Sequence, residues 1–338
     1  MKILVIGAGA IGGSLATYLC AASADVTILE LNPDTCNCIV NNGLTVVDGE
    51  KTFSSAVEIV NSTDELKGKV FDCCFSATRA YNMPAAVKSV LPYLTGDSLI
   101  VAMNNGVCID ELAEIVGYDR AVGGMINYGV GISSPGNYYI KIRGDLILGM
   151  VRKNNSKSIP KSLVRLNELL NKAIPASITD NIIGCLYSKM LINSCITSSA
   201  LISGLPLGSI LKNKKGRALF TAVATEGIAV AKAAGITVPR YAEKLNYYSL
   251  IKNDLFHKIK RCLTYNIMAK KYKSRTSASL EALRRGVKTE TYYFNGYIAR
   301  LGRKYGIPTP ANDKICELIN RVENDIALIS PHNLNFGF

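Results

Sequence analysis

The feature that most constrains this chain is a glycine pattern directly after an apolar run near its start. Residues 2–6 read Lys-Ile-Leu-Val-Ile, and Gly7-Ala8-Gly9-Ala10-Ile11-Gly12 follows with the spacing GxGxxG. The pattern alone would also suit a glycine-rich hairpin, but residues 11–22 continue as an apolar helical segment. A strand, a glycine turn and a helix in this order are typical of a unit that binds the pyrophosphate of a dinucleotide.

Each glycine of this turn has a separate physical role. We expect Gly7 to allow the tight turn, Gly9 to let the backbone approach the pyrophosphate, and Gly12 to permit close packing of helix on strand. The pyrophosphate itself would lie at the helix N-terminus, where amide N–H groups point outward. The sequence therefore predicts cofactor contacts along Gly7–Gly12, including Ala8, Ala10 and Ile11.

Glu30 indicates which dinucleotide the chain prefers. It ends the second predicted strand, 18 residues after Gly12, and no Arg or Lys follows before Lys51. A carboxylate at this place accepts hydrogen bonds from a ribose 2′-hydroxyl and repels a 2′-phosphate. The alternative is an ordinary exposed Glu at a strand end. We expect NAD(H) to be preferred, with NADP(H) still possible.

Strand and helix patterns alternate through the first 150 residues, which predicts a mainly parallel sheet covered by helices. The expected strands are Lys2–Ile6, Asp25–Leu29, Leu44–Val47, Ala56–Val60, Val70–Ser76, Ser98–Met103, Ala121–Ile126, Tyr138–Ile142 and Asp145–Leu148. The expected helices are Ile11–Ala22, Met83–Leu94 and Ile109–Val116. We expect the last hairpin-like strands to extend this sheet at one edge.

The second half of the chain has helical patterns only. The expected helices are Ser162–Lys172, Thr179–Ala200, Arg217–Ala234, Leu280–Leu301 and Ala311–Leu328. The fold class is therefore α/β, with an N-terminal dinucleotide-binding domain over residues 1–178 and an all-helical domain over 179–330. We expect a loosely held tail at 331–338. The basic stretch 241–275 has no clear pattern.

Composition excludes several classes of function. The net charge is +13, from 39 Lys and Arg against 26 Asp and Glu, and it suits either a solvated basic face or anionic ligands. The basic runs are short and lack interleaved aromatics, so we expect no nucleic-acid partner. Ten Cys without CxxC spacing and only two His predict no metal site and a cytoplasmic protein with reduced thiols. No apolar run is long enough for a membrane span.

A dinucleotide-dependent reductase needs a proton donor as well as a hydride. With only His257 and His332 in the chain, both in polar surroundings, another group is expected to serve. Lys189 lies in an otherwise apolar helical segment, and Asn193 is four residues later on the same face. A buried Lys is costly without a partner; a Lys that reaches the surface is the alternative. Glu290 is a possible partner because aromatic residues follow it, although its own pattern favours an ordinary exposed Glu.

The chain resembles the ketopantoate reductase family, which reduces 2-dehydropantoate to pantoate. The resemblance rests on motifs that occur in the family order and span nearly the whole chain. They are Gly7–Gly12, Asn104-Asn105-Gly106, Lys189-x-x-x-Asn193, Gly286-x-x-Thr289-Glu290, Asn295-Gly296 and Gly306-Ile307-Pro308-Thr309-Pro310-Ala311-Asn312. It implies a Rossmann domain, a helical C-terminal domain and an active site in a cleft between them.

The resemblance also implies roles for individual residues. Lys189 would be the general acid and would polarise the carbonyl of the 2-oxo acid, while Asn193 would bind substrate. Glu290 would hold Lys189 and contact a substrate hydroxyl. On the cofactor side, Asn105 would touch the nicotinamide ribose, and Arg79 stands where the family has a Lys.

Several positions depart from the family pattern. Thr197 replaces a second Asn, and a substrate-binding Ser falls on Ala278, between Ser277 and Ser279, which are the expected substitutes. An Asp falls on Ala282, and an Arg associated with NADP falls on Leu31. These departures affect the substrate more than the reaction type.

Three functions are therefore compatible with the sequence. The first is a 2-dehydropantoate 2-reductase. The second is an NAD-dependent D-2-hydroxy acid dehydrogenase for another branched or bulky 2-oxo acid, which Thr197 and Ala278 favour. The third is a non-catalytic NAD-binding sensor, against which the retained Lys189, Asn193 and Glu290 argue. A homodimer is possible by analogy only.

Overall fold

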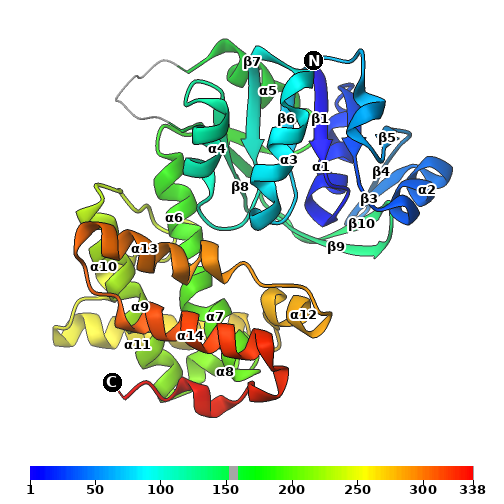
Figure 1. The fold of residues 1–338 in the computed structure, drawn as a ribbon. Helices are drawn as coiled ribbons and strands as arrows, with labels where there is room; N and C mark the ends of the chain where they lie inside the picture. The colour runs from blue at the N-terminus through cyan, green and yellow to red at the C-terminus, as the bar shows by residue number, and fades with distance from the viewer. Residues whose placement is uncertain (152–158, 338) are drawn as a thin grey trace. The chain divides into compact units, whose positions relative to one another are not determined.

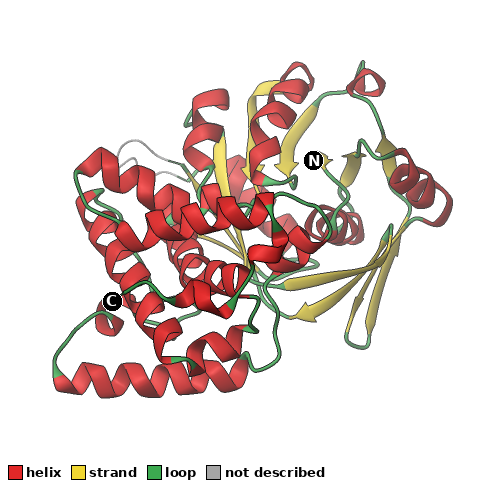
Figure 2. Ribbon diagram, turned by 60° about the horizontal axis from the view of Figure 1, so that its bottom comes forward, coloured by secondary structure: helices red, strands yellow, loops and turns green. Residues whose placement is uncertain are grey.

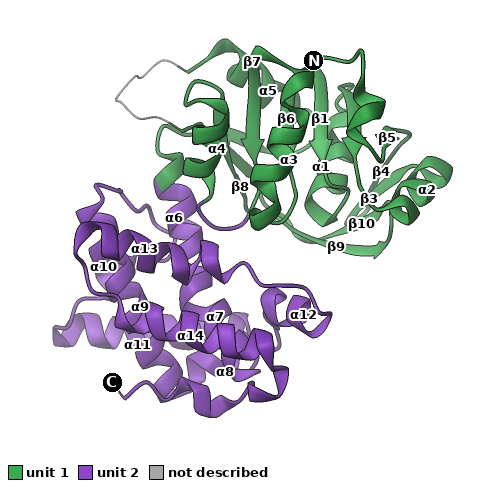
Figure 3. Cartoon of the chain, in the orientation of Figure 1, with its two compact units in different colours: residues 1–104, 108–183 green, residues 105–107, 184–338 purple. Residues whose placement is uncertain are grey.

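The computed structural model describes residues 1–151 and 159–337, which form two compact units. Unit 1 contains residues 1–104 and 108–183, and unit 2 contains residues 105–107 and 184 onward (Figure 3). The change of unit at residue 183 lies inside a helix, whereas the boundary predicted at residue 178 coincides with the end of a strand.

Unit 1 is built on an eight-stranded sheet whose order is β12-β11-β8-β7-β6-β1-β2-β5. Its strands are β1 (Lys2–Ile6), β2 (Asp25–Leu29), β5 (Glu58–Val60), β6 (Phe71–Ser76), β7 (Leu94–Ala102), β8 (Ala121–Ile126), β11 (Leu146–Met150) and β12 (Ala176–Ile178). All neighbouring pairs are parallel except β8 with β11. The predicted α/β class with a Rossmann-like sheet is thus confirmed.

Helices cover this sheet (Figures 1 and 2). They are α1 (Ala10–Ala21), α2 (Pro33–Asn42), α3 (Met83–Val90), α4 (Ile109–Val116) and α5 (Lys161–Leu170), with the short turns η1 (Thr63–Leu66), η2 (Ala80–Asn82) and η3 (Leu91–Tyr93). From β1 the chain passes through α1 to β2 on one side, and from β6 through α3 and α4 to β8 on the other. Because such crossovers are right-handed, α1 lies on one face of the sheet and α3 and α4 on the opposite face.

The buried strands explain why this sheet forms. Ile3, Leu4 and Val5 of β1 are fully buried, as are Cys73, Cys74 and Phe75 of the neighbouring β6. A strand covered on both faces requires a continuous apolar run and not an alternating one. The core of unit 1 is centred on these strands, with Leu15 and Leu19 of α1 packed against them.

A second sheet corrects one prediction. The strands β4 (Lys51–Ser55), β3 (Leu44–Asp48), β10 (Asn137–Ile142) and β9 (Gly129–Ser134) form it, in this order. The expectation that residues 138–142 extend the main sheet was wrong, because Tyr138 of β10 packs onto α1 instead. Only the strand predicted at 145–148, found as β11, continues the main sheet.

Unit 2 consists of helices joined by loops, and its described residues contain no strand, only an isolated bridge between Tyr241 and Leu245. Its helices are α6 (Ile182–Ile192, which begins in unit 1), α7 (Ser198–Ser203), α8 (Leu207–Lys212), α9 (Lys214–Ala233), α10 (Tyr247–Leu250), α11 (Leu255–Lys271), α12 (Ala278–Arg284), α13 (Asn295–Tyr305) and α14 (Pro310–Asn324). Short turns are η4 (Asn193–Thr197, a π-helix), η5 (Thr291–Tyr293), η6 (Ile326–Leu328) and η7 (Pro331–Leu334). Together α6, η4 and α7 run continuously through the core, packed by α9, α13 and α14.

Two predictions in unit 2 were wrong. The single helix expected over 280–301 is broken into α12, η5 and α13, because Gly286 adopts a left-handed conformation with φ of +73° and α12 ends before it. The tail is not loose as far as residue 337, since Leu334 is buried and Asn333 donates a hydrogen bond of 2.8 Å to the Ile202 carbonyl. Residue 338 lies outside the described residues.

Membrane-spanning helices and metal-binding clusters are both missing from the described residues. Among residues 1–151 and 159–337, no helix combines the length and apolar character that crossing a bilayer requires. Within the same ranges, no three His, Cys, Asp or Glu side chains gather as a metal site would need. No disulfide joins any of the ten cysteines, all of which lie in the described part of the chain.

Candidate active site

The glycine turn of unit 1 has the geometry of a phosphate-binding turn. Gly7 has a φ of +95°, which a side chain would strain. A Cβ at Gly12 would lie 1.9 Å from the Gly7 carbonyl oxygen, so only glycine fits at this position in the first turn of α1. By contrast, nothing lies within 4 Å of a Cβ built on Gly9, so the backbone there borders open space. No side chain caps α1 at Gly9, which leaves its first-turn amide N–H groups without intrahelical partners.

Two side chains hold this turn in place. The buried hydroxyl of Tyr138 donates a hydrogen bond of 2.7 Å to the Ala8 carbonyl. The Glu30 carboxylate accepts one from the Ala8 amide at 2.8 Å and a second from the Asn32 amide at 2.9 Å. Each Glu30 oxygen therefore keeps capacity for another donor, because a carboxylate oxygen can accept two.

Arg79 lies at the same edge of the sheet. Strand order reverses between β1 and β6, so the turns that follow Ile6 and Ser76 meet at the point where open α/β sheets bind ligands. The two turns touch, since a Cβ on Gly7 would lie 3.3 Å from the Ala77 carbonyl oxygen. Arg79 is partly exposed two residues further along.

Asn104 belongs to the Asn104-Asn105-Gly106 motif, but the sequence predicted no role for it. Its side chain is buried at the carboxyl end of β7, and its Nδ2 donates a hydrogen bond of 2.6 Å to the Thr78 carbonyl. Its Oδ1 is buried without a hydrogen-bond partner among the residues that the structure describes. Such an atom is costly unless a ligand donor meets it. The Asn-Asn pair at 104–105 was the only signal in the sequence.

These features fit a dinucleotide. Open backbone at Gly9, unpaired amides at a helix N-terminus, a carboxylate with spare acceptor capacity and an orphaned acceptor on Asn104 all lie on unit 1. Phosphate oxygens suit the amides, and ribose hydroxyls suit the carboxylate. The residues predicted to bind the cofactor, except Asn105, thus belong to one compact unit.

Unit 2 holds the candidate catalytic residues on one helical face. Lys189, Asn193 and Thr197 are partly exposed, while every other residue between 186 and 203 is buried. A strict α-helix drifts when residues are spaced by four, because it has 3.6 residues per turn. The π-helix η4, which spans Asn193–Thr197, has a wider turn and brings Thr197 back to the same side.

Two buried tyrosines fix the segment around Lys189. Tyr187 donates a hydrogen bond of 2.7 Å to the Gly227 carbonyl of α9, and Tyr247 donates one of 2.8 Å to the Ser188 carbonyl. The hydroxyl of Ser188 in turn donates to the Pro239 carbonyl at 3.0 Å. The two residues that precede Lys189 are thus anchored, which limits the positions that the Lys189 side chain can take.

The charge of Lys189 is set by burial and by Glu290. Burial lowers the pKa of Lys189 from its ordinary 10.5 to about 8, and the negative charge of Glu290 acts in the opposite direction. Glu290 is itself buried, at 6% exposure. An ammonium with a pKa near neutrality is protonated yet able to give up its proton, which is what a general acid requires.

Glu290 does not lie on a helix, although the sequence predicted a helix over residues 280–301. It follows the left-handed Gly286 and precedes η5, in an irregular segment anchored by a hydrogen bond of 2.8 Å from the Thr289 amide to Glu323 of α14. Its sequence pattern alone had favoured an exposed Glu, but Glu290 is buried in this irregular segment.

Asn105 belongs to unit 2, as part of the short segment Asn105–Val107 that unit 1 flanks on both sides. The next residue, Gly106, lies against η5, since a Cβ there would be 2.5 Å from the Tyr293 carbonyl oxygen. Asn105 is exposed. Because Gly106 lies against η5, Asn105 is near the segment that carries Glu290.

Ser277 and Ser279 differ in their surroundings. Ser277 is buried, caps α12 at the Leu280 amide and donates a hydrogen bond of 3.1 Å to the Thr197 carbonyl. Its hydroxyl is therefore already used to join α12 to the π-helix. Ser279 is partly exposed and is the second residue of α12. Both remain predictions as substrate-binding residues.

A polar network behind η4 was not predicted as such. Asn295 donates to the Ser194 carbonyl at 3.3 Å and accepts from Ser198 at 2.6 Å. It also donates to Asn312, whose side chain and backbone amide donate to Glu226. The Asn295-Gly296 and Pro-Ala-Asn motifs therefore support the segment that presents Asn193.

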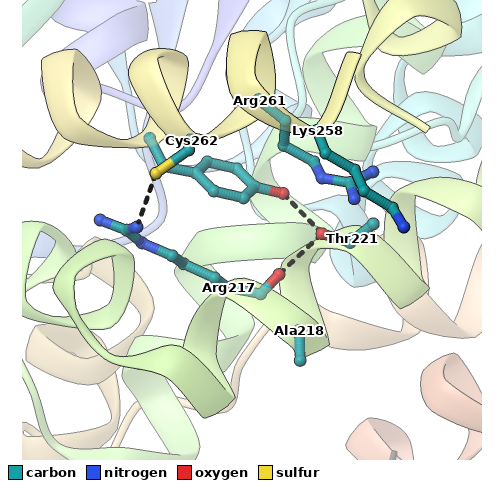
Figure 4. A pocket seen from close by; sticks show the side chains of 7 residues that line it. Arg217, Ala218, Thr221, Lys258, Arg261 and Cys262 are labelled. Carbon is teal, nitrogen blue, oxygen red and sulfur yellow. Dashed lines mark hydrogen bonds between the residues drawn. The ribbon is translucent and has the colours of Figure 1, made fainter. Parts of the chain in front are cut away.

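The hollow between α9 and α11 is a separate feature (Figure 4). It encloses about 230 Å³ and is lined by seven residues, among them Arg217, Lys258 and Arg261. Arg217 is engaged with Asn266 at 2.6 Å, and Thr221 shares a hydrogen bond of 2.8 Å with Tyr265. Neither Lys189 nor Glu290 lines it, so it is separate from the candidate active site.

Comparison with known proteins gives a consistent family assignment. A family model described as ketopantoate reductase PanE/ApbA matches residues 3–153, and one for the C-terminal domain of the same family matches residues 181–323. The 2-dehydropantoate 2-reductase of Pyrococcus abyssi is 28% identical over 333 residues, covering 96% of this chain and 98% of the relative.

Solved structures share the fold. A ketopantoate reductase of the PanE/ApbA family from Ralstonia eutropha JMP134 has a TM-score of 0.79 at 23% identity, covering 96% of this chain and 99% of that one. A D-mandelate dehydrogenase determined with NADH and anilino(oxo)acetate also has a TM-score of 0.79, at 20% identity, covering 97% and 100%. At these identities the likeness concerns the fold alone.

Proposed function

This chain belongs to the ketopantoate reductase family, and we propose on that premise that it reduces 2-dehydropantoate to pantoate with a nicotinamide cofactor. The observation that carries the proposal is the row formed by Lys189, Asn193 and Thr197, with Glu290 acting on the charge of Lys189. These groups provide a proton donor and hydrogen-bonding groups for a 2-oxo acid.

Each residue of the row has a defined task in this proposal. The Nζ of Lys189 donates a hydrogen bond to the carbonyl oxygen of the substrate and gives it a proton as the alkoxide develops. The amide of Asn193 and the hydroxyl of Thr197 orient the acid, with Ser279 or Ser277 at the far end. Glu290 keeps Lys189 protonated and accepts a hydrogen bond from a substrate hydroxyl.

On unit 1, the first turn of α1 would hold the pyrophosphate, Arg79 a phosphate, and Glu30 the adenine ribose. Asn105 would contact the nicotinamide ribose. When bound, the cofactor supplies the hydride; the protein contributes orientation and charge. We infer that NADH is preferred to NADPH, because a 2′-phosphate would meet the Glu30 carboxylate. The reaction requires Lys189 of unit 2 and the nicotinamide on unit 1 to meet.

A second candidate is an NAD-dependent D-2-hydroxy acid dehydrogenase for another branched or bulky 2-oxo acid. Two substitutions favour it. Ala278 cannot hydrogen-bond where the family has a substrate-binding Ser, and Thr197 is shorter than the Asn of the family. Lys189, Asn193 and Glu290 suit both reactions.

Steady-state rates of NADH and NADPH oxidation with a panel of 2-oxo acids test the proposal. The panel contains 2-dehydropantoate, its straight-chain analogue 2-oxobutyrate, the branched 2-oxoisovalerate and the aromatic benzoylformate. We expect the highest kcat/KM with 2-dehydropantoate and NADH. Turnover only of the other acids would support the second candidate, and binding of NADH without turnover of any acid would indicate a sensor.

A further inference from the structure

A groove runs between α9 and α11 of unit 2. Its first part is the hollow shown in Figure 4, and a second hollow of about 460 Å³ continues it, because Ala218, Thr221 and Arg261 line both. We call the two hollows together the α9–α11 groove. It is cationic at one end, where Lys258 and Arg261 line it, and it reaches Glu226 at the other end.

The cations of the groove have no acidic partner among the described residues. Helix α11 contains no Asp or Glu, and Glu226 is the only acidic residue of α9. Within residues 1–151 and 159–337, no carboxylate lies within 4.0 Å of a charged nitrogen of Arg217, Lys258 or Arg261. Lys258 and Arg261 are three residues apart on one face of α11, so their charges repel each other unless an anion offsets them.

Neutral acceptors hold both guanidinium groups in place. Arg261 donates through Nη1 to the Leu250 carbonyl at 2.9 Å. Arg217 donates to the Leu211 carbonyl and, at 2.6 Å, to the Asn266 side chain. These contacts fix the two side chains without cancelling their charge. A site whose charged groups are fixed in advance loses less conformational entropy when a ligand binds.

The positive charges converge on the middle of the groove. Lys258 and Arg261 extend from α11 toward Thr221 of α9 (Figure 4). Burial raises the pKa of Tyr265, and the charges of Arg261 and Arg217 act in the opposite direction, so both charges are near its hydroxyl. A recess lined by charges of one sign attracts a ligand of the opposite sign, and most strongly a ligand with more than one charge.

A phosphate monoester matches this end of the groove. It carries about two negative charges near pH 7 and three acceptor oxygens. The Nε and Nη2 of Arg261 make no hydrogen bond to the described residues, and together they form the fork that binds two phosphate oxygens. The ammonium of Lys258 can bind the third oxygen. A carboxylate has one charge and two oxygens, so it would leave part of the positive charge unmatched.

Glu226 indicates what the rest of the ligand carries. Its Oε1 accepts a hydrogen bond of 2.7 Å from the Ala311 amide, and its Oε2 accepts two from Asn312. A carboxylate oxygen can accept two hydrogen bonds, so Oε1 has room for one more donor. Between the two ends of the groove, the short side chains of Ala218 and Ala222 leave space for a carbon skeleton. A hydroxyl on that skeleton would donate to Glu226.

We propose that the α9–α11 groove binds the phosphate monoester of a small hydroxylated molecule, with its phosphate at Lys258 and Arg261 and a hydroxyl at Glu226. Glu226 is bonded to Asn312 and so to the polar network behind η4, which makes the ligand an effector of the candidate active site. The binding is independent of the proposed reaction, whereas the effect on turnover rests on it.

Ribose 5-phosphate is the probe, because it has a phosphate monoester at one end and hydroxyls at the other. Calorimetric titration of the full chain in saturating NADH, which fills the cofactor site, measures its Kd. Lys258→Gln removes one charge-assisted hydrogen bond and should raise this Kd by about tenfold. Lys260→Gln makes the same change at an exposed lysine that does not line the groove, and it should leave the Kd unchanged. Circular dichroism verifies that both variants fold.

Related ligands test the chemistry of the two ends. Inorganic phosphate should compete with ribose 5-phosphate but bind more weakly, because it cannot reach Glu226. Ribose without the phosphate should not bind at the same concentrations. The Kd of ribose 5-phosphate should rise with ionic strength, because the attraction is between charges at the protein surface.

Steady-state kinetics with 2-dehydropantoate and saturating NADH test the effector role. A donor to Glu226 weakens its hold on the Ala311 and Asn312 amides, so ribose 5-phosphate should raise the KM for 2-dehydropantoate by about fivefold. In Lys258→Gln the same effect should need about tenfold more ribose 5-phosphate. This dependence distinguishes the groove from direct competition at the substrate site, which Lys258→Gln would not change.

Three results would overturn the proposed site. One is no binding of ribose 5-phosphate to the parent. Another is binding that Lys258→Gln and Lys260→Gln affect equally, which would indicate attraction to the basic surface in general. The third is binding of a single-stranded oligonucleotide that ribose 5-phosphate does not displace, which would identify a nucleic acid as the occupant. Binding with an unchanged KM would contradict the effector role. Because calorimetry needs no turnover, a chain that reduces no 2-oxo acid still tests the groove.

Discussion

Lys189 shows how one residue acquires a chemical role from its neighbours. In isolation its ammonium would hold its proton to pH 10.5, and burial in unit 2 lowers the pKa to about 8. Glu290 prevents a larger decrease. The balance between these two effects decides at which pH the group can donate a proton.

Replacement of Lys189 tests this role. Lys189→Ala should lower kcat by about 10²–10⁴, the range for a lost general acid, while NADH still binds, as fluorescence titration measures. Lys232→Ala, an exposed Lys on α9, is the control and should keep the parent rate. A kcat unchanged in Lys189→Ala would remove this residue from the mechanism.

The pH dependence follows from the same pKa. In the direction of reduction the parent needs protonated Lys189, so kcat/KM should fall as the pH rises above about 8. Glu290→Gln removes the charge that raises this pKa, so the fall should begin at lower pH. The effect of Lys189 on stability has the opposite dependence on pH. Between pH 8 and 10.5 the unfolded chain binds more protons at Lys189 than the folded chain does, so the free energy of unfolding rises with pH in this range.

Glu30 is tested by cofactor preference. Glu30→Gln keeps an acceptor for the Ala8 amide but removes the negative charge that a 2′-phosphate would meet. We expect Glu30→Gln and Glu30→Ala to lower the preference for NADH, measured as kcat/KM with NADH divided by kcat/KM with NADPH. Asp34→Asn, a nearby exposed acid in α2, should not change the ratio. Equal use of both cofactors by the parent would contradict this interpretation of Glu30.

At the scale of elements, the π-helix η4 is what aligns Asn193 and Thr197 with Lys189. A π-turn leaves backbone groups in unusual positions, and here the carbonyls of Ser194 and Thr197 accept hydrogen bonds from Asn295 and Ser277. Irregular turns of this kind persist only where surrounding groups support them. The support comes from α12, α13 and α14, which are distant in sequence.

Glu226 is the last residue of the hydrogen-bond network that supports η4, and its contribution to stability can be tested. Its carboxylate accepts hydrogen bonds from the backbone amides of Ala311 and Asn312 and from the Asn312 side chain. Glu226→Gln replaces one acceptor by a donor facing these groups. We expect the free energy of unfolding, measured in urea, to fall by about 1–3 kcal/mol. Glu317→Gln, exposed on α14, should change it by less than about 0.5 kcal/mol; an equal effect would contradict the role of Glu226.

At the scale of the whole molecule, the main feature is that the candidate cofactor-binding residues and the candidate catalytic residues belong to different compact units. The glycine turn, Glu30, Arg79 and Asn104 belong to unit 1, and Lys189, Asn193 and Glu290 belong to unit 2. Only the segment 105–107 joins unit 2 out of sequence order. Cofactor binding and proton donation should therefore be separable by mutation.

Ligand-dependent stability tests that separation. NADH at about 100 times its Kd should raise the free energy of unfolding of the cofactor-binding unit by about 2.7 kcal/mol. Lys189→Ala should keep this increase, whereas Glu30→Ala should reduce it at the same NADH concentration. Differential scanning calorimetry with and without NADH measures both. A loss of the increase in Lys189→Ala would mean that the two roles are not separable.

The sequence by itself was sufficient for features that depend on neighbours along the chain. The run Lys2–Ile6 and the glycines of residues 7–12 predicted β1, the turn and α1, because the spacing of a tight turn before a helix is a local property. Strands buried on both faces, such as Phe71–Ser76, were predicted for the same reason. Lys189 and Asn193 were placed on one face because both lie in the same helical segment.

Only the tertiary structure decided features that join distant segments. It put β10 into a second sheet against α1, broke the predicted helix at Gly286 and brought Glu290 to act on Lys189 from an irregular segment. It also showed that Ser277 is used to hold the π-helix, and that α9 and α11 bring Arg217, Lys258 and Arg261 to one groove. The physical reason is that local patterns fix the conformation of a segment, whereas burial, pKa and pairing depend on which other segments pack against it.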